Sequence, residues 1–490
     1  MITIIYAVLL SIMDFDVRRL EPYYRLSQPQ GARASSSLNL DHMTMFQYLV
    51  PFKAFRLRQW AVFFSTIGNI IASTIAPALQ NPSIYVDKNP NCPENEEDKC
   101  FDGLPRYRVR ISPIWSRSLS TSYAVIAMIT IILFVQLRRK SGLLSDPKGI
   151  AGIASMATKS HILHDFHGMD EATRGQIHKR LQHRQFVLYK SSIWQGEWNS
   201  STEPIQESEN RLRSPHPIML QLRAGWFLLG FMGVMLVGVS LVSLGPLNAI
   251  PNAVPWLPVL LATLLKTVFM TFESDVRLME PFYQLSKGNA TPQNSLTLDY
   301  QATMYGWMPI KAMFKKHWLV ALVGFSSVAL DVLTVTVSSF SVNAGSLLRS
   351  HVKGGSNSSQ DETFASFMAS TVLSITILVF VMTSTSLIYL RRRHPFLPRE
   401  PSTIAAVLAF IYASKMLNDF IDTETFNNKQ MEARLKSLGK TYGLGWFRGR
   451  DGKVHCAIDE EPMTSKYVHG KSYHMSQAGP LDVDESYIHV

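Results

Sequence analysis

The chain has 490 residues, of which 46% are hydrophobic and only 17% are charged, and its mean hydropathy is +0.05. Soluble proteins carry roughly 25% charged residues, so this composition argues against a soluble protein and indicates apolar spans separated by polar segments. The net charge of +11 arises from basic residues beside apolar runs, without a nucleic-acid-binding motif, so we expect no nucleic-acid partner.

A helix needs about 20 apolar residues to cross a bilayer. Six segments approach or exceed that length, and a seventh at the N-terminus is shorter. The stretch between Arg223 and Lys266 divides in two because Gly245 and Pro246 open a helix-breaking segment. All of these spans are expected to be continuous. In chain order they are residues 1–13, 60–79, 121–137, 225–244, 253–272, 318–340 and 367–390.

The same unit occurs twice in the same order. Residues 16–27, with the pattern Asp-Val-Arg-x-x-Glu-Pro-Tyr-Tyr-x-Leu-Ser, return as residues 275–286 with Phe at the first tyrosine. The second copy has four spans, and the first has counterparts of only the last three. The chain is therefore expected to begin inside a span, either because the gene model starts late or because this is a divergent short form. A longer transcript is predicted to encode a further hairpin. Shorter matches join residues 38–41 with 296–299, 51–54 with 309–312, 146–147 with 400–401, and 160–166 with 414–420.

These patterns predict an all-α integral membrane bundle of two tandem repeats with the same orientation, the first lacking its opening helix. A basic linker separates the repeats, and a juxtamembrane helix, a small hairpin and a disordered tail follow the second. The predicted parts are residues 1–137, 138–223, 224–390, 391–458 and 459–490.

The doubled Asp-Val-Arg-x-x-Glu-Pro motif, with Leu-x-Leu-Asp at 38–41 and 296–299 and Pro-x-Lys-Ala at 51–54 and 309–312, resembles a family of fungal multipass membrane proteins. That family carries domain of unknown function 3433. The resemblance implies a fungal source and a duplicated membrane unit, and it implies no activity.

The positive-inside rule orients the spans. Residues 138–223 contain thirteen lysines and arginines, and Arg391, Arg392 and Arg393 follow the last span, so both segments are predicted to be cytoplasmic. The opposite loops hold Cys92 and Cys100, a disulfide candidate, and Asn357, a glycosylation candidate. We expect the plasma membrane or a secretory-pathway membrane.

The repeated motif is predicted to lie at the cytoplasmic interface. Proline disfavours the helical conformation of the preceding residue, so Glu21 and Glu280 should end their helices. The arginines are expected to pair with these glutamates three residues on, or with lipid phosphate. The motif is then either an anchor and turn, or a site for lipid headgroups or anionic ligands. Its residues are Asp16, Arg18, Glu21, Pro22, Tyr24, Asp275, Arg277, Glu280, Pro281 and Tyr283.

Segments 52–58 and 311–317 mix aromatic, apolar and basic residues, which predicts short interfacial helices on anionic lipid. Segment 404–416 is apolar enough to lie on the membrane or dip into it. Residues 442–458 predict a small β-hairpin around an Asp-Gly turn.

Asp331 is the sharpest single residue, because an acid inside a span is costly unless it is paired or hydrated. Lys266 on the preceding span is either its partner or a side chain that snorkels to the interface. Asn69 completes this candidate intramembrane polar site, although an interhelical hydrogen bond explains it equally well.

His161, His164 and His167 recur at a spacing of three, a weak zinc pattern that also fits a polar helix face. The second copy has Lys415, Asn418 and Ile421 there. No nucleophile, kinase or dinucleotide motif is present, so we expect no catalytic residue and no cofactor.

The sequence favours a non-enzymatic scaffold or sensor with protein partners at its linker and tail. The alternative is a transporter or channel that uses Asp331 and Lys266, and a membrane-bound enzyme is a weaker third reading. The expected lipid partners are anionic lipids of the inner leaflet. The oligomeric state stays open.

Overall fold

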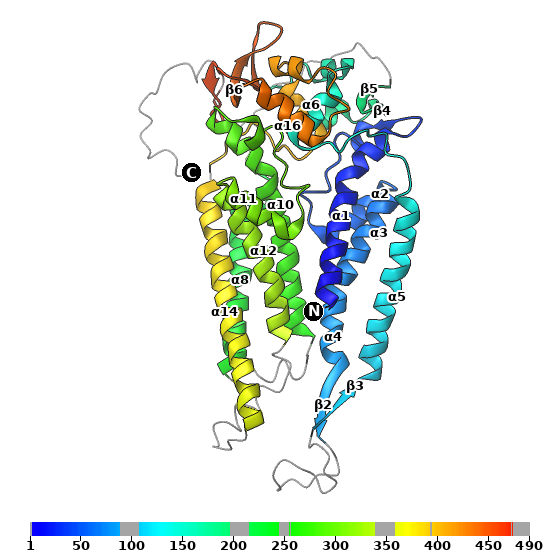
Figure 1. The fold of residues 1–490 in the computed structure, drawn as a ribbon, viewed down its shortest axis with the longest axis vertical. Helices are drawn as coiled ribbons and strands as arrows, with labels where there is room; N and C mark the ends of the chain where they lie inside the picture. Colours follow the sequence, from blue (N-terminus) through cyan, green and yellow to red (C-terminus); the bar gives the residue numbers. More distant parts are fainter. Residues whose placement is uncertain are drawn as a thin grey trace.

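A bundle of long helices carries a compact body at one end (Figure 1). The computed structural model is 64% helix and 8% strand. We call the compact body the head; it comprises residues 27–49, 141–196, 288–307 and 394–471. The structure describes residues 2–88, 107–196, 215–244, 254, 256–338, 358–392, 394–471 and 473.

Within the described residues, six helices are long and apolar enough to cross a membrane. The first repeat contains α1 (Ile2–Leu26), α2 (Val50–Arg56), α3 (Trp60–Ile70), the π-helical turn η3 (Ile71–Ile75), α4 (Ala76–Ser83) and α5 (Pro113–Gln136). The second contains α8 (Leu222–Leu244), α10 (Leu257–Lys287), α11 (Met308–Phe314), α12 (Trp318–Ser338) and α14 (Ser358–Arg392). At the end far from the head, β2 (Ile84–Lys88) pairs with β3 (Tyr107–Ile111).

The described part of the first repeat has no counterpart of α8. In the second repeat, α8 packs along α14. The span in α14 is 44% buried inside the protein, whereas the span in α5 is only 17% buried. In the described part of the first repeat, no helix covers α5 as α8 covers α14.

One prediction about the helices is wrong. Pro22 and Pro281 lie inside α1 and α10 and do not end them. A proline inside a helix costs roughly 3 kcal/mol, but here the next turn is held by packing, with Leu26 and Leu285 fully buried. The span that follows α2 is one helix, Trp60–Gln80, and η3 is a π-helical turn within it.

The head is itself duplicated, although the sequence predicts its two halves as a linker after the first repeat and a separate segment after the second. The first repeat supplies α6 (Gly149–Ala157), η4 (His161–Phe166), α7 (Arg174–Leu181), β4 (Gln185–Tyr189) and β5 (Ser192–Gln195). The second repeat supplies, in the same order, α15 (Ile404–Ile411), η10 (Lys415–Phe420), α16 (Asn428–Ser437), β6 (Tyr442–Arg448) and β7 (Val454–Glu460). The segment called a linker is therefore the end of the first repeat.

Local sequence explains the shared helix starts. The side chains of Thr173, before α7, and Asn427, before α16, each accept a hydrogen bond from the backbone N–H of a glutamine three residues on. The side-chain oxygen of that glutamine accepts the backbone N–H of the threonine or asparagine in return. This reciprocal arrangement satisfies two of the free N–H groups at a helix start.

Small antiparallel sheets complete each half. β1 (Ala32–Arg33) pairs with β4, and the equivalent Ala290 forms a bridge to Tyr442 at the start of β6. The predicted hairpin is present as β6 and β7, and β8 (Ser465–Lys466) adds a third strand. Order therefore continues past residue 459, where the disordered tail was predicted to begin. Asp459 is buried and accepts the backbone N–H groups of Lys415 and Met416, both at 2.8 Å.

The apolar segment that begins at Ile404 does not meet the membrane. All eight residues of α15 are buried inside the head, where the helix packs on α6 and β7. A helix that is apolar on every face belongs in a protein core as readily as on a bilayer. Here the facing elements of both repeats cover it.

The two repeats exchange contacts through the head. The N–H of Ala405 in α15 bonds the carbonyl of Leu38 in the first repeat at 3.0 Å. Reciprocally, the N–H of Ala151 in α6 bonds the carbonyl of Leu296 in the second repeat at 2.9 Å. Each Leu-x-Leu-Asp loop thus receives the helix start of the other repeat, so the head ties the repeats together. We call this arrangement the crossing.

Gly149 tests the crossing. Its φ of +61° favours glycine, and a Cβ there would lie 2.6 Å from the carbonyl oxygen of Leu296. We expect Gly149→Ala to lower the free energy of unfolding by about 2–4 kcal/mol, measured by denaturation of the purified protein in detergent. Gly168 has a φ of +71° and open space around it, so Gly168→Ala controls for backbone strain alone. Equal losses in the two variants would contradict the crossing.

Candidate functional site between the two repeats

In each repeat, the glutamate of the Glu-Pro motif, on α1 or α10, forms an ion pair with an arginine that follows the last span. Glu21, near the end of α1, is 1% exposed, and its Oε2 lies 2.5 Å from Nη2 of Arg139. The guanidinium carbon of Arg139 lies 3.3 Å from the ring centre of Tyr24. Arg25 adds a second bond to Glu21 at 3.0 Å. A carboxylate and an aromatic face thus hold one guanidinium.

The second repeat builds the same clamp. Glu280 forms a buried ion pair with Arg392, whose guanidinium carbon lies 3.4 Å from the ring centre of Tyr283. The planar guanidinium can bond a carboxylate and stack on a ring at once, which a lysine does less well. The motif tyrosines therefore stack on arginines.

The predicted pairing of the motif arginines is wrong. Arg18 and Arg277 contact the acids four residues earlier, Asp14 at 2.7 Å and Glu273. Positions four apart lie on one face of a helix, and the glutamates three residues on are taken by the clamps. Sequence reasoning missed both acids, although their presence at the same position in both copies was a signal.

Asp14 is the centre of a polar cluster between α1 and α3. It is fully buried and accepts hydrogen bonds from Ser65 at 2.7 Å, Thr66 at 2.9 Å and Asn69 at 3.2 Å. Asn69 also accepts one from Ser11 at 2.7 Å. Asn69 therefore bonds between helices of the first repeat and belongs to this cluster, not to the pair in the second repeat with which it was grouped.

Lys266 and Asp331 meet in the second repeat. The lysine Nζ on α10 bonds Oδ1 of the aspartate on α12, and the hydroxyl of Tyr305 donates to Oδ2 at 2.7 Å. The same hydroxyl lies 3.1 Å from Oγ of Ser327. Lys266 is 6% exposed, so it pairs inside the protein and does not extend to the interface.

This pair is particular to the second repeat. The aligned positions of the first repeat hold Ala7 and Ser73. In the first repeat, the hydroxyl of Tyr48 lies 2.9 Å from the hydroxyl of Thr74, which belongs to the π-helical turn η3. A charged pair and a neutral contact thus occupy similar places in the two copies.

A cavity of about 220 Å³ lies between α1 of the first repeat and α10 of the second. We call it the interface cavity. Its apolar wall includes Phe15 and Met270. The charged side chains that line it are Asp16, Lys266, Glu273 and Arg277, and the uncharged polar ones include Ser11 and Tyr305. Charged groups from both repeats therefore face one mostly apolar space.

A second cavity of about 150 Å³ shares Arg277 and Gln301 with the first. Duplicated residues face each other across it, among them Pro22 with Pro281 and Leu40 with Leu298. It therefore marks the place where the repeats meet, next to the crossing.

The first aspartate of the motif differs between copies. Asp275 is fully buried and accepts the N–H of Met219, just before α8, at 3.3 Å. Asp16 lines the interface cavity instead. Its Oδ1 lies 3.8 Å from Nε of Arg19.

The head contains a second polar cluster that sequence reasoning missed. Nδ1 of His455 lies 2.8 Å from Asp170, and Nε2 lies 2.9 Å from Asp451. Tyr412 also bonds Asp170. Asp170 comes from the first repeat and the other three residues from the second, so only tertiary structure brings them together.

The remaining predicted sites find no further support. His161 and His164 lie in the 3-10 turn η4 with ring centres 6.2 Å apart, and His167 packs on Tyr412 instead. Among the described residues, no three His, Cys, Asp or Glu side chains are placed to hold a metal ion. The candidates Cys92, Cys100 and Asn357 lie outside the described residues.

The clamp predicts a stability effect. Arg392→Gln leaves Glu280 buried without its counter-charge, so we expect the free energy of unfolding to fall by about 3–5 kcal/mol. Arg391→Gln, at the exposed neighbouring position, is the matched control and should change it little. Unfolding in detergent, followed by tryptophan fluorescence, measures both, and an unaffected Arg392→Gln variant would rule out the clamp.

The His455 cluster predicts a pH effect. Hydrogen bonding to Asp170 and its negative charge, with a further contribution from Asp451, raise the pKa of His455 above its ordinary value of 6.5. Folding then favours the protonated ring, so this stabilisation is full below pH 6.5 and is lost as the pH rises through the folded-state pKa. We expect His455→Gln to remove that loss above pH 6.5, while His183→Gln, at an exposed site, keeps it. Parallel pH profiles of stability for native protein and His455→Gln would refute the assignment.

Comparison with known proteins agrees with the duplication. A family model described as Protein of unknown function (DUF3433) matches residues 1–82 and 253–342. These ranges cover equivalent parts of the repeats, from the helix that carries the motif to the following span. No curated protein and no solved structure matches the chain. The family model thus matches an equivalent part of each repeat, which is consistent with a duplicated DUF3433 domain.

Proposed function

We propose that the chain is a non-enzymatic membrane sensor that crosses the bilayer several times and carries its head in the cytoplasm. One observation supports this most directly. Arg277 lines the interface cavity and also the second cavity, whose far wall includes Ile150 of α6 and Ile404 of α15. An occupant of the interface cavity would therefore touch residues adjacent to the crossing.

The proposed mechanism is a shift between two arrangements of the repeats. A ligand that binds one arrangement more tightly raises its population. Because α6 and α15 each dock on the opposite repeat, a relative displacement of the repeats must be absorbed in the head. The apolar wall and the few charged groups of the interface cavity suit a small amphiphile.

The proposed orientation determines which segments would face the cytoplasm and which would face the outer side. Basic residues of segment 138–223 would face anionic lipid of the inner leaflet, and the head would offer a surface to protein partners. Cys92, Cys100 and Asn357 would then lie on the outer side, in the plasma membrane or a secretory-pathway membrane. A disulfide and a glycan are expected there.

A transporter is the second candidate. The buried pair of Lys266 and Asp331 beside the interface cavity favours it. Ionisable pairs inside transmembrane bundles commonly mark ion or proton paths. Duplicated bundles with a site between repeats are also common among transporters.

A double variant separates the two candidates. Lys266→Ala with Asp331→Ser gives the second repeat the residues that the first carries at these positions, so no charge is left unpaired. The protein is reconstituted in vesicles that report proton and potassium flux, and hydrogen exchange of α6 and α15 is followed in nanodiscs. Ser73→Ala is the control in the first repeat.

For a sensor, we expect no flux from native or variant protein, and faster exchange at α6 and α15 in the double variant than in Ser73→Ala. Flux that the double variant abolishes would replace the sensor with the transporter. Unchanged exchange in the head would also count against sensing, because it would show that the pair is not coupled to the crossing.

A further inference from the structure

The head contains a third and larger cavity, of about 700 Å³, which the proposed function does not use. Both repeats line it. Lys53 comes from α2, whose neighbouring Phe52 is 75% exposed, and residues 215–221 lead directly into α8. The cavity therefore lies in the head beside the ends of the membrane helices. Its volume falls in the range of small-molecule sites, roughly 300–1,000 Å³.

The charged lining is predominantly basic. Lys53, Arg174, Lys179 and Arg399 face the cavity, against one acid, Glu400. Arg174 is already neutralised, because it contacts Glu400 at 3.0 Å and Asp41 at 2.9 Å. Lys53, Lys179 and Arg399 are then left without an acid in the cavity lining to balance their charge.

Arg399 is the least explained of these cations. It is 2% exposed, and Nη1 donates to the carbonyls of Met169, Asp170 and Ala172 at 2.7, 3.0 and 3.2 Å. Among the described residues, no acceptor lies within hydrogen-bond distance of Nη2. The nearby carboxylate of Asp170 is occupied by Tyr412 and His455. Burial lowers the pKa of Arg399 to about 10, so the guanidinium is still charged at neutral pH.

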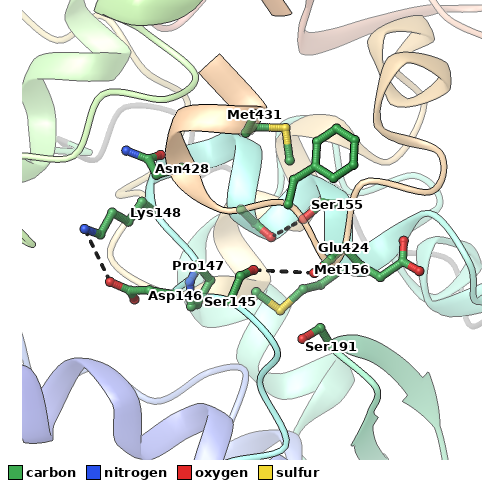
Figure 2. A pocket seen from close by; sticks show the side chains of 12 residues that line it. Ser145, Asp146, Pro147, Lys148, Ser155, Met156, Ser191, Glu424, Asn428 and Met431 are labelled. Atoms are coloured by element: carbon green, nitrogen blue, oxygen red, sulfur yellow. Dashed lines mark hydrogen bonds and ion pairs between the residues drawn. The ribbon is translucent and has the colours of Figure 1, made fainter. Parts of the chain in front are cut away.

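The duplication shows what this position needs for folding. Its counterpart is Ser145, whose hydroxyl donates to the carbonyl of Glu424 at 3.4 Å. That carbonyl is the equivalent of the Asp170 carbonyl bonded by Arg399. Figure 2 shows this counterpart site, where Ser145, Asp146 and Asn428 border a space of only about 20 Å³. A serine satisfies the fold there, so the fold alone does not call for an arginine at 399.

The helices beside the two sites also differ in charge, and the helix beside the large cavity is the more basic at the aligned positions. α7 presents His178 and Lys179 to the large cavity. At the aligned positions α16 has Glu432 and Ala433. The first turn of α7 also lines the cavity, and the start of a helix carries partial positive charge. Three independent substitutions thus make one of two equivalent sites large and cationic.

We propose that this cavity binds a phosphate-bearing ligand of the size of an inositol phosphate, with Arg399 and Lys179 contacting the phosphates. Arginine and lysine are the usual phosphate ligands, and a buried guanidinium with a free donor is completed by an anion. The position beside the membrane helices admits a lipid headgroup, and the volume admits a soluble phosphate ester. The proposal does not depend on the sensing role.

The full-length protein is tested in nanodiscs. Inositol trisphosphate is titrated by calorimetry into protein in phosphatidylcholine nanodiscs, which tests the soluble source. Thermal stability in phosphatidylcholine nanodiscs with added phosphatidylinositol bisphosphate, or with added phosphatidylserine, tests the lipid source, because a bound ligand raises the unfolding temperature.

We expect binding in at least one arm, weakened about tenfold or more by Lys179→Glu, the size of one lost charge-assisted contact. Lys436→Glu makes the same charge change on the exposed face of α16 and should leave binding intact. Arg399→Ser copies the counterpart site and should abolish binding while the protein stays folded, as its unliganded unfolding temperature will report.

Binding of inositol trisphosphate alone would support a soluble ligand, and stabilisation by phosphatidylinositol bisphosphate but not phosphatidylserine would support a headgroup. Absence of both responses in native protein overturns the proposal. Equal loss in Lys179→Glu and Lys436→Glu also overturns it, because it would reveal nonspecific attraction between charges.

Discussion

Two buried glutamates constrain the rest of the structure. Glu21 and Glu280 lie where α1 and α10, the helices that carry the motif, enter the head, and each needs a counter-charge because an isolated buried carboxylate is strongly unfavourable. Arg139 and Arg392, from the ends of the last spans, provide it. The motif-bearing helix and the last helix of a repeat are thereby held together at one level, and the following turns pack well enough to carry a proline inside a helix.

The crossing places a further constraint on the two clamped repeats. Each Leu-x-Leu-Asp loop accepts a backbone bond from the other repeat, so neither half of the head is complete on its own. The apolar helix α15 is buried as a consequence. Segments that lie between or after the spans in sequence thus become one body, although about 250 residues separate equivalent positions.

Departures from the duplication set the two copies apart. The pair of Lys266 and Asp331 stands where the first repeat has an alanine and a serine, and Arg399 stands where it has a serine. Each difference adds buried charge, which is costly without a partner. Lys266 and Asp331 are partners of each other inside the protein, whereas Arg399 lines a cavity and has one donor, Nη2, without a partner among the described residues.

The sequence by itself determined the six long spans, the duplication and the pairing candidate for Asp331, because length, apolar composition and repeated order are properties of the linear chain. It misplaced the helix ends at Pro22 and Pro281, the pairing of Arg18, and the environment of segment 404–416. Those depended on which side chains from distant segments cover a surface or neutralise a charge. Only tertiary structure decided that Arg139 takes Glu21, that α15 is a core helix, and that Asp170 meets His455 across the repeats.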